Sequence, residues 1–560
     1  MGRVFKNPEE LLKKFVRKKD HIHLSAVMSR PNLLINQLCR VFYHQKPEFT
    51  VSVTGIHSNA NAIALSGICS RMITGFLGDN YPRPIPNRLY ENVWKGNPFE
   101  LELWSLWSFV QRLMAGSMKL EYTVSNSLLG SDMISDKLGK TAFIQNDSEG
   151  KEILLLKAMN PDITLIHSVV ADEEGNFVLS EPGGESFYGA LAAKRGILVS
   201  AEKIVPAGMI PSSLISVSGT NVLGVVEIPF GTHPQSLRVP DQPFFASLGL
   251  ETYLDDYSFI EETNRLTGGA PADRQDWLEN WILENSEPTQ YFRKLGVEFP
   301  QRVNPKKYAP KTKKEAPQKA NSNEQIIVLA ARKICSLVKK NGYKSILAGI
   351  GAAHISAWLA SLLLKKEGIQ IPVLAELGFY DVTPYKGDVF LFSQLHADNS
   401  ASLTDIQGIL GTAVPDRCLG VLGAAEIDLL GNLNSTLSAD GKFIVGSGGA
   451  NDIASTADCL AVARIGKGRA VSKVSYVTSP GKRVISLVTQ FGVFDKNGAE
   501  EFSLSSFLPV PEKPDLNASE CIEKFSDWKI GTEEFLQEEG VLELELAILR
   551  ELDPERIYIG

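Results

Sequence analysis

The chain has 560 residues, of which 44% are hydrophobic and 22% charged, and its formal net charge is −8 at pH 7. This length exceeds a single ordinary hydrophobic core, and the composition is that of a globular protein. The acidic balance argues against nucleic acid as a partner, because such binders carry a basic face. No apolar run reaches the roughly 18 residues that span a bilayer, and residues 1–20 contain no signal-peptide core, so we expect a cytoplasmic protein that does not bind membranes.

Strands alternate with helices along the N-terminal half. Apolar residues at helical spacing predict helices over residues 8–16, 31–44 and 186–196. Runs rich in Ile, Val and Thr predict strands over residues 21–27, 49–56, 162–170 and 196–202. His21 and His23 share one face of the first strand, but no third ligand lies nearby, so we expect no metal site.

A linker divides the chain. In residues 304–325, NPKKYAPKTKKEAPQKANSNEQ, apolar periodicity gives way to Lys, Pro, Ala and Asn. We therefore expect one domain over residues 1–303 and another over residues 326–560. The second half alternates again, with a helix, a strand, a helix and a strand predicted over residues 323–342, 345–351, 352–368 and 369–376. This pattern predicts an α/β protein with two open, mainly parallel α/β domains joined by the linker.

A single carboxylate, Glu376, stands at the end of the last of these strands, with a glycine and an aromatic pair close behind it in AELGFYDVTP. In open α/β sheets, ligands bind beyond the carboxyl ends of the strands. A buried, unpaired carboxylate shifts its pKa or takes part in chemistry. Glu376 is therefore a candidate catalytic residue, and a capping or ion-pair role in a loop is the alternative.

Two glycine-rich stretches in the same half lie at strand–helix junctions. LAGIGAAH contains Gly349 and Gly351, but His354 occupies the third glycine position of a dinucleotide fingerprint, so that motif is absent. FIVGSGGANDIAS offers consecutive backbone amides that can bind a phosphate or an oxyanion. Tight turns, or helix capping by Asn451 or Asp452, are the alternatives. Together with Glu376, these stretches point to acyl chemistry.

The C-terminal half contains, in order, AELGFYDVTP, VLGAAEIDLLGNLNST, GSGGANDIAS, SYVTSPG and LRELDPERIY. This ordered set resembles the β part of family I coenzyme A transferases, most closely the glutaconate CoA-transferase type. The N-terminal half resembles the α part of the same family through MNPDITLIHSVVADEEGN, LVSAEKIVP and GTHPQSL. The chain therefore looks like a fusion of α-like and β-like halves.

The resemblance implies that Glu376 is a nucleophile that attacks an acyl-CoA thioester to give an acyl-glutamyl anhydride and then a glutamyl-CoA thioester, from which a carboxylic acid collects CoA. It implies coenzyme A as a substrate, no permanently bound cofactor or metal, and association into a homo-oligomer. The implied oxyanion and CoA-binding loops comprise Gly448, Gly449, Ala450, Asn451, Gly349 and Gly351.

In the N-terminal half, GFLGDNYPRP stands where the family lines its substrate site, which makes Asn80, Tyr81 and Arg83 candidate binding residues. Arg83 could hold a second carboxylate bidentately, or it could be a surface charge. Ser25 and Ala26 stand where the family commonly has a glycine pair, which implies a narrower pocket.

Two other functions remain open. Relatives on the same fold include acyl-CoA hydrolases and ring-opening or decarboxylating C–C lyases, in which another carboxylate acts as a base. Glu100 and Glu102 could serve, although a solvated helix face is the alternative for them. A non-catalytic acyl-CoA-binding protein is the third hypothesis, and the retention of Glu376 beside the glycine loop argues against it.

Overall fold

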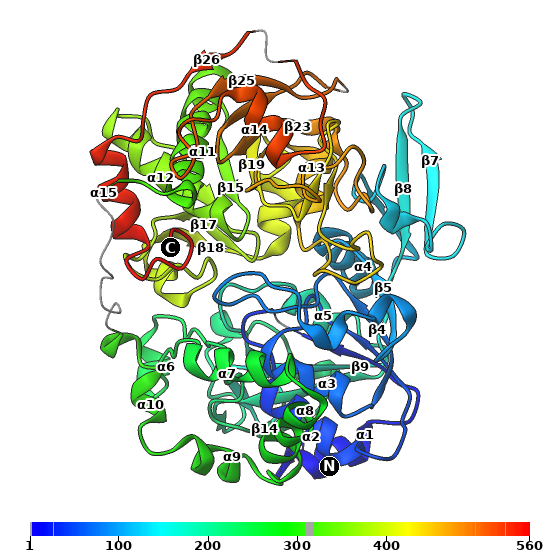
Figure 1. The fold of residues 1–560 in the computed structure, drawn as a ribbon. Coiled ribbons are helices and arrows are strands. Elements are labelled where there is room, and N and C mark those ends of the chain that lie inside the picture. Colours follow the sequence, from blue (N-terminus) through cyan, green and yellow to red (C-terminus); the bar gives the residue numbers. More distant parts are fainter. Residues whose placement is uncertain (1–2, 26, 309–318, 499, 532–533) are drawn as a thin grey trace.

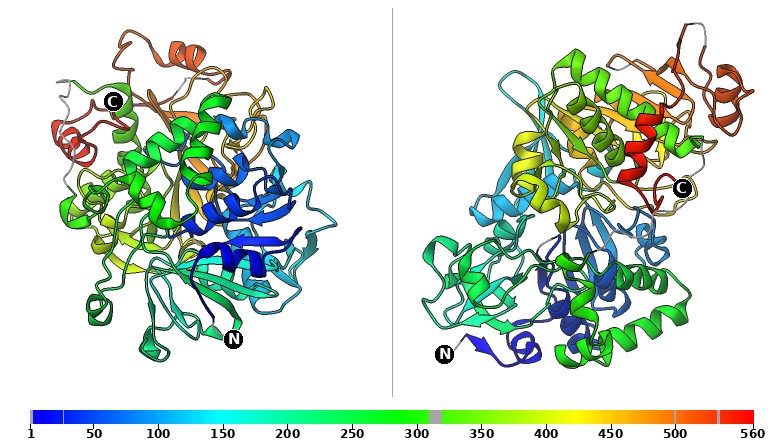
Figure 2. Two further views of the ribbon diagram at one scale, coloured as in Figure 1. Left: turned by 90° about the horizontal axis from the view of Figure 1, so that it is seen from below. Right: turned by 90° about the vertical axis from the view of Figure 1, so that its left-hand side faces the viewer.

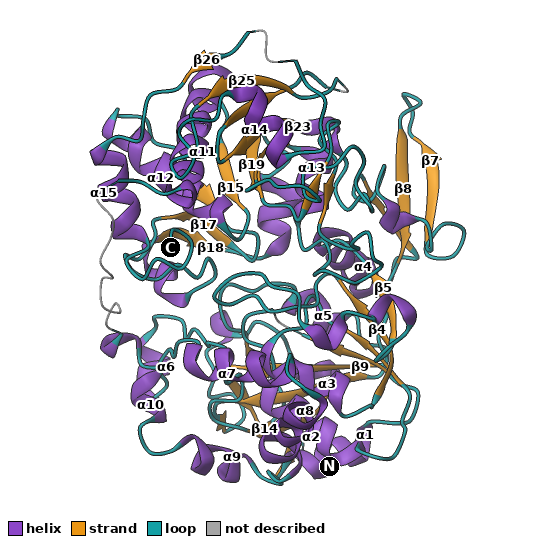
Figure 3. Ribbon diagram, viewed as in Figure 1, coloured by secondary structure: helices purple, strands orange, loops and turns teal. Residues whose placement is uncertain are grey.

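The computed structural model describes residues 3–25, 27–308, 319–498, 500–531 and 534–560. Two large sheets, one from each half of the chain, lie in separate lobes that face each other (Figure 1). Helices flank the strands of both lobes (Figure 3). The predicted fold class, α/β with two open and mainly parallel sheets, is confirmed.

All neighbouring strands of the N-terminal sheet are parallel. In spatial order they are β1 (Val4–Phe5), β14 (Val222–Glu227), β12 (Gly196–Ala201), β9 (Ile163–Ser168), β2 (His21–Leu24), β3 (Phe49–Ser52), β4 (Cys69–Thr74) and β5 (Glu100–Leu103). The main helices of this lobe are α1 (Pro8–Phe15), α2 (Asn32–Phe42), α4 (Leu106–Ser117), α5 (Ser186–Leu191), α7 (Tyr257–Thr267), α8 (Pro271–Leu278) and α9 (Pro288–Leu295).

The C-terminal sheet is parallel through its first five strands and antiparallel at the next two pairings. Its order is β16 (Val373–Leu374), β15 (Ser345–Ala348), β19 (Cys418–Leu422), β22 (Asp458–Val462), β23 (Val484–Thr489), β24 (Gly492–Asp495), β25 (Ser503–Phe507) and β26 (Leu536–Gln537). Its helices are α11 (Ser322–Asn341), α12 (Ala352–Lys366), α13 (Ala450–Thr456), α14 (Ala518–Phe525) and α15 (Glu543–Leu552).

Local sequence signals explain where the main helices begin and end. Asn7 caps α1 by accepting the N–H of Glu10, and Pro8 follows at the first helical position. Asn321 and Glu324 form a reciprocal capping box at the start of α11, and Gly342 ends that helix in the left-handed conformation. The predicted strand over 369–376 is shorter than expected, because only Val373 and Leu374 pair within the sheet.

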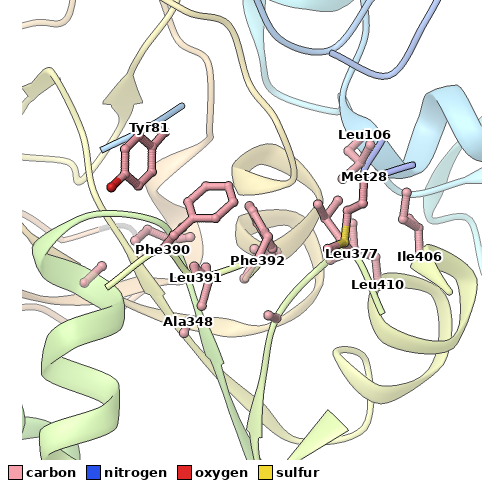
Figure 4. Close-up of a cluster of buried hydrophobic side chains, with 14 of the residues drawn as sticks. Met28, Tyr81, Leu106, Ala348, Leu377, Phe390, Leu391, Phe392, Ile406 and Leu410 are labelled. Carbon is pink, nitrogen blue, oxygen red and sulfur yellow. The ribbon is translucent and has the colours of Figure 1, made fainter. Parts of the chain in front are cut away.

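The two halves share one buried apolar layer where they meet. Met28 and Leu106 of the N-terminal half belong to the same buried cluster as Leu377 and Leu410 of the C-terminal half (Figure 4). The right-hand view of Figure 2 shows the C-terminus close to where the two lobes meet and the N-terminus at the far end of its lobe. The domain limits remain a prediction, and residues 309–318 of the expected linker lie outside the described residues.

Candidate active site

Glu376 lies in a tight turn that follows β16. Ala375 and Phe379 exchange backbone hydrogen bonds of 3.0 and 3.2 Å, so residues 376–378 reverse the chain into β17 (Phe379–Val382). Gly378 has φ +122°, and a Cβ there would lie 2.5 Å from the carbonyl oxygen of Thr404. Only glycine fits this position, and the turn carries Glu376 beyond the carboxyl end of its strand.

The carboxylate of Glu376 rests against the glycine-rich loop. The backbone N–H of Gly449 donates a hydrogen bond to it. A Cβ on Gly449 would overlap Oε2 of Glu376, whereas a Cβ on Gly448 would lie 3.8 Å from Oε1. The two motifs, 72 residues apart at positions 376 and 448, therefore meet in space.

Backbone hydrogen bonds join this loop to the N-terminal half. The N–H of Gly448 donates to the carbonyl of Gly75 at 3.0 Å, and its own carbonyl accepts from the N–H of Leu106 at 2.9 Å. The N–H of Leu77 donates to the carbonyl of Val445 at 2.9 Å. The loop that contacts Glu376 is thus held by both halves of the chain, and the site lies at their contact.

A cavity of about 560 Å³ surrounds Glu376. Among its walls are six residues of the C-terminal half that the sequence predicted: Glu376, Gly448, Gly449, Ala450, Gly349 and Gly351. Asn80 and Arg83 contribute from the N-terminal half, together with His57, Asp255, Met28 and Ile260. This volume is that of a typical small-molecule site.

Tyr81 and Asn451 have other contacts. The Tyr81 ring stacks on Tyr257 with centroids 4.2 Å apart and meets Phe390 edge-on. The Asn451 side chain donates to the carbonyl of Thr478 at 2.9 Å and accepts from the N–H of Leu128 at 2.8 Å. Both side chains are buried and support the walls without being among the residues that line the cavity.

The glycine turn before α12 is closed by a histidine. The N–H of Gly351 donates to Nδ1 of His354 at 2.9 Å, and Nε2 of His354 lies 3.0 Å from the carbonyl of Val389. This arrangement fixes the neutral tautomer that donates from Nε2. A Cβ on Gly349 would lie 2.7 Å from the carbonyl of Val421, so the strand and the turn pack too closely for a side chain. His354 therefore stabilises the turn, a role that the sequence alone did not indicate.

The environment makes Glu376 less acidic. Burial raises its pKa to about 7, the nearby carboxylate of Asp452 contributes to the rise, and the hydrogen bond from Gly449 opposes both. Asp452 accepts hydrogen bonds from the Ser105 hydroxyl at 2.6 Å and from the N–H of Trp107 at 2.9 Å. Because Trp107 lies in the first turn of α4, Asp452 also joins the helix of one half to the glycine loop of the other.

Two polar residues of the N-terminal wall are functional candidates that sequence reasoning missed. His57 follows β3 closely, and the strand-end rule that selected Glu376 would also have found it. The buried Arg30 guanidinium donates to the carbonyl of Gly55 at 2.7 Å and lies 3.3 Å from Nε2 of His57. Burial, and then Arg30, hold the pKa of His57 well below its usual range, so the ring is neutral.

Asp255 is the second of these candidates. Burial raises the pKa of its carboxyl to about 7, and the N–H of Ser236 donates to it at 3.3 Å. It precedes α7 in a loop, where the sequence gives no periodic or motif signal. The cavity therefore contains two carboxyl groups, Glu376 and Asp255, that both titrate near neutral pH.

The expectation of a solvated helix face for Glu100 and Glu102 is wrong, since both lie on strand β5. Glu102 is 6% exposed, forms ion pairs with Arg71 and Arg112, and accepts a hydrogen bond from Nε1 of Trp104 at 2.7 Å. Two guanidinium groups thus compensate its charge. Neither glutamate is among the residues that line the cavity.

Ser25 directly follows β2. Ser25 is fully buried and its N–H donates to the carbonyl of Leu165, whereas Ala26 lies outside the described residues.

In the described part of the chain, no three His, Cys, Asp or Glu side chains gather in a way that could hold a metal ion. No described helix combines the length and apolar character needed to cross a membrane.

Comparison with known proteins shows what the chain resembles in sequence and in fold. Residues 5–227 match the family model described as coenzyme A transferase. One of the 3-oxoadipate CoA-transferase subunits of Pseudomonas knackmussii is 31% identical over 169 residues, which is 30% of this chain and 59% of that relative. One of the glutaconate CoA-transferase subunits of Acidaminococcus fermentans is 40% identical over 70 residues, which is 12% of this chain and 26% of that relative. These alignments thus span less than two thirds of either relative.

A solved structure extends the likeness to the whole fold. The acyl-CoA transferase YdiF of Escherichia coli O157:H7 superposes with a TM-score of 0.63 over 96% of this chain and 95% of its own, at 17% sequence identity. The second of the two 3-oxoadipate CoA-transferase subunits of Pseudomonas knackmussii also matches, at 28% identity over 157 residues, so this single chain has similarity to both kinds of subunit. The chain thus resembles coenzyme A transferases in the sequence of residues 5–227 and in its overall fold.

Proposed function

We propose that this protein transfers coenzyme A between an acyl-CoA thioester and a carboxylic acid, with Glu376 as the nucleophile. The observation that supports it best is the carboxylate of Glu376 held against the backbone of Gly448 and Gly449 in a cavity shared by both halves. A carboxylate aimed into an enclosed site beside backbone donors is what acyl transfer requires.

The chemistry follows from this geometry. A carboxylate oxygen of Glu376 attacks the thioester carbonyl, and the backbone N–H of Gly449, which contacts that carboxylate, is the donor placed to stabilise the oxyanion, worth roughly 3–4 kcal/mol. The C–S bond breaks, CoA leaves as a thiolate and an acyl-glutamyl anhydride remains. The thiolate then attacks the glutamyl carbonyl, which releases the acid and leaves glutamyl-CoA. An incoming carboxylate completes the exchange by the reverse steps.

Mass spectrometry of the peptide that contains Glu376 tests this proposal. After incubation with a panel of acyl-CoAs and no acceptor acid, we expect a glutamyl-CoA adduct on Glu376 and no catalytic release of CoA. Free CoA that accumulates over many turnovers without an adduct would contradict the transferase assignment.

Hydrolysis of an acyl-CoA is the second candidate, because Asp255 places another carboxyl with a pKa of about 7 in the same cavity. Such a group can act as a general base toward water at neutral pH. If the protein is a hydrolase, Asp255→Asn will abolish acceptor-free CoA release. If the protein is a transferase, the wild-type protein will already show no acceptor-free release of CoA.

The pH dependence of adduct formation should report the ionisation of Glu376. Only the carboxylate is nucleophilic, so the rate should rise with pH and level off above about 7. Because Asp452 raises the pKa of Glu376, Asp452→Asn should move the midpoint to lower pH. Ser105→Ala removes a hydrogen bond that favours the charged form of Asp452, so it should move the midpoint in the same direction by a smaller amount. An unchanged midpoint in Asp452→Asn would contradict this account.

Arg83 would select among acceptor acids. The two relatives are named for 3-oxoadipate and glutaconate, which are both dicarboxylic acids. Arg83 lines the cavity and could bind the second carboxylate. Arg83→Gln should raise the KM for dicarboxylic acceptors about tenfold or more, and leave monocarboxylic acceptors unaffected. Arg88→Gln, an exposed arginine outside the cavity walls, is the matched control.

A further inference from the structure

An arm of three strands projects from the N-terminal half. It comprises β6 (Tyr122–Ser125), β8 (Glu152–Lys157) and β7 (Ala142–Asn146), in that order and all antiparallel. The hairpin of β7 and β8 extends away from both large sheets (Figure 1). Helix α4 contacts β6 and β8, so the base of the arm is anchored to the body.

Both faces of this arm are mainly apolar. On the inner face Ala142, Leu154 and Leu156 are fully buried. On the outer face, the strand register places Val124, Leu155 and Phe143 in one row across all three strands. Tyr122 and Ile153 extend the outer face, each beside a polar residue, Lys157 toward the base and Gln145 toward the tip. The Tyr122 and Phe143 rings lie 5.8 Å apart.

The outer face is accessible to solvent in this chain. Val124 is 53% exposed, and the other four residues of the face are partly exposed. A sheet with one buried face ordinarily presents polar residues on the other, so an apolar outer face indicates a partner.

Charge identifies which partner fits. The tip of the arm carries Asp147, Glu149, Lys151 and Glu152, three acidic residues against one basic. The base carries Lys119, Glu121, Lys140 and Lys157, three basic residues against one acidic. Seven of these eight residues are exposed, and Asp147 is half-buried. Two arms that lie face to face and antiparallel would place each tip on the base of the other. The surface is therefore complementary to itself under a two-fold rotation.

We propose that the outer face of this arm is a homodimer interface, in which the row Val124–Leu155–Phe143 packs against the same row of a second copy. The sheets would stack at about 10 Å with their strands aligned, as in a β-sandwich. This interface is separate from the cavity, so its test does not depend on the proposed function.

Sedimentation velocity over a concentration series tests the interface. We expect the wild-type chain to form a dimer and the double variant Val124→Asp/Leu155→Asp to raise the dissociation constant by at least about 30-fold, the loss of an interface hot spot. Val297→Asp, at a 92% exposed valine elsewhere, should sediment as wild type. A monomeric wild type, or a double variant that sediments like wild type, would overturn the proposal.

Two further experiments test orientation and folding. Glu149→Cys/Lys140→Cys should yield a disulfide-linked dimer under mild oxidation, against a low background because all six native cysteines are buried. Charge reversal at the tip, in Glu149→Lys/Glu152→Lys, should weaken the dimer. A variant that combines these changes with charge reversal at the base, Lys140→Glu/Lys157→Glu, should restore dimer formation. Failure of both the cross-link and the restoration would overturn the antiparallel arrangement. Unchanged melting temperatures would show that each variant is folded.

Discussion

Glu376→Gln should abolish the covalent adduct and lower CoA transfer by about 10⁴-fold or more. The amide keeps the size of the side chain and can still contact Gly449, but it lacks the nucleophilic oxygen that accepts the acyl group. Losses of this size are typical when a covalent nucleophile is removed. Steady-state transfer assays and mass spectrometry of the Glu376 peptide measure both effects. A variant that retains more than a few per cent of wild-type turnover would remove Glu376 from the mechanism.

A stability measurement separates this loss from misfolding. The pKa of Glu376 is raised in the folded state from 4.5 to about 7, so folding favours the protonated form. The contribution of Glu376 to the free energy of unfolding is therefore largest below pH 4.5, and it is lost as pH rises through about 7. Glu376→Gln removes the penalty, on the order of 3 kcal/mol. The variant should melt above wild type at pH 8 and together with it near pH 5. If it melts below wild type at both values, lost activity would reflect damage to the fold.

The candidate residues of the C-terminal half that meet in the cavity have local sequence signals. Glu376 ends an apolar strand, and Gly448 and Gly449 lie at a strand–helix junction. Each position therefore follows from the rule that ligands bind at carboxyl ends of strands. The contact between them is set by a tight turn and by hydrogen bonds to Gly75 and Leu106 from the other half, which no local pattern encodes.

The N-terminal side was harder to predict. The alternation of Glu and Leu in ELEL, which contains Glu100 and Glu102, has the period of two that indicates a strand, and a helix face was the wrong interpretation. Asp255 comes from a loop whose position depends on tertiary packing. Asp452 was considered only as a helix cap, yet its carboxylate accepts hydrogen bonds from Ser105 and Trp107 of the opposite half.

Gly449→Ala should lower CoA transfer by about 100-fold or more while leaving the fold intact. The backbone at Gly449 has φ −86° and ψ −2°, which alanine adopts without strain. The added Cβ would overlap Oε2 of Glu376 and lie 3.2 Å from its Cδ, so the carboxylate must turn away from the loop. A displacement of about 1 Å is enough to cost 100-fold in rate. Wild-type turnover in this variant would show that contact with the loop does not position Glu376.

Two further variants separate steric displacement from general damage. Gly448→Ala should destabilise the protein by about 1 kcal/mol, because φ +49° is unfavourable for alanine, yet its Cβ would lie 3.8 Å from Oε1 and should displace the carboxylate less. Glu376→Asp shortens the nucleophile by one methylene and makes room for the new Cβ. The combined loss in Gly449→Ala/Glu376→Asp should therefore be smaller than the product of the two single losses. Fully multiplicative losses would mean that the two positions act independently, contrary to the contact between them.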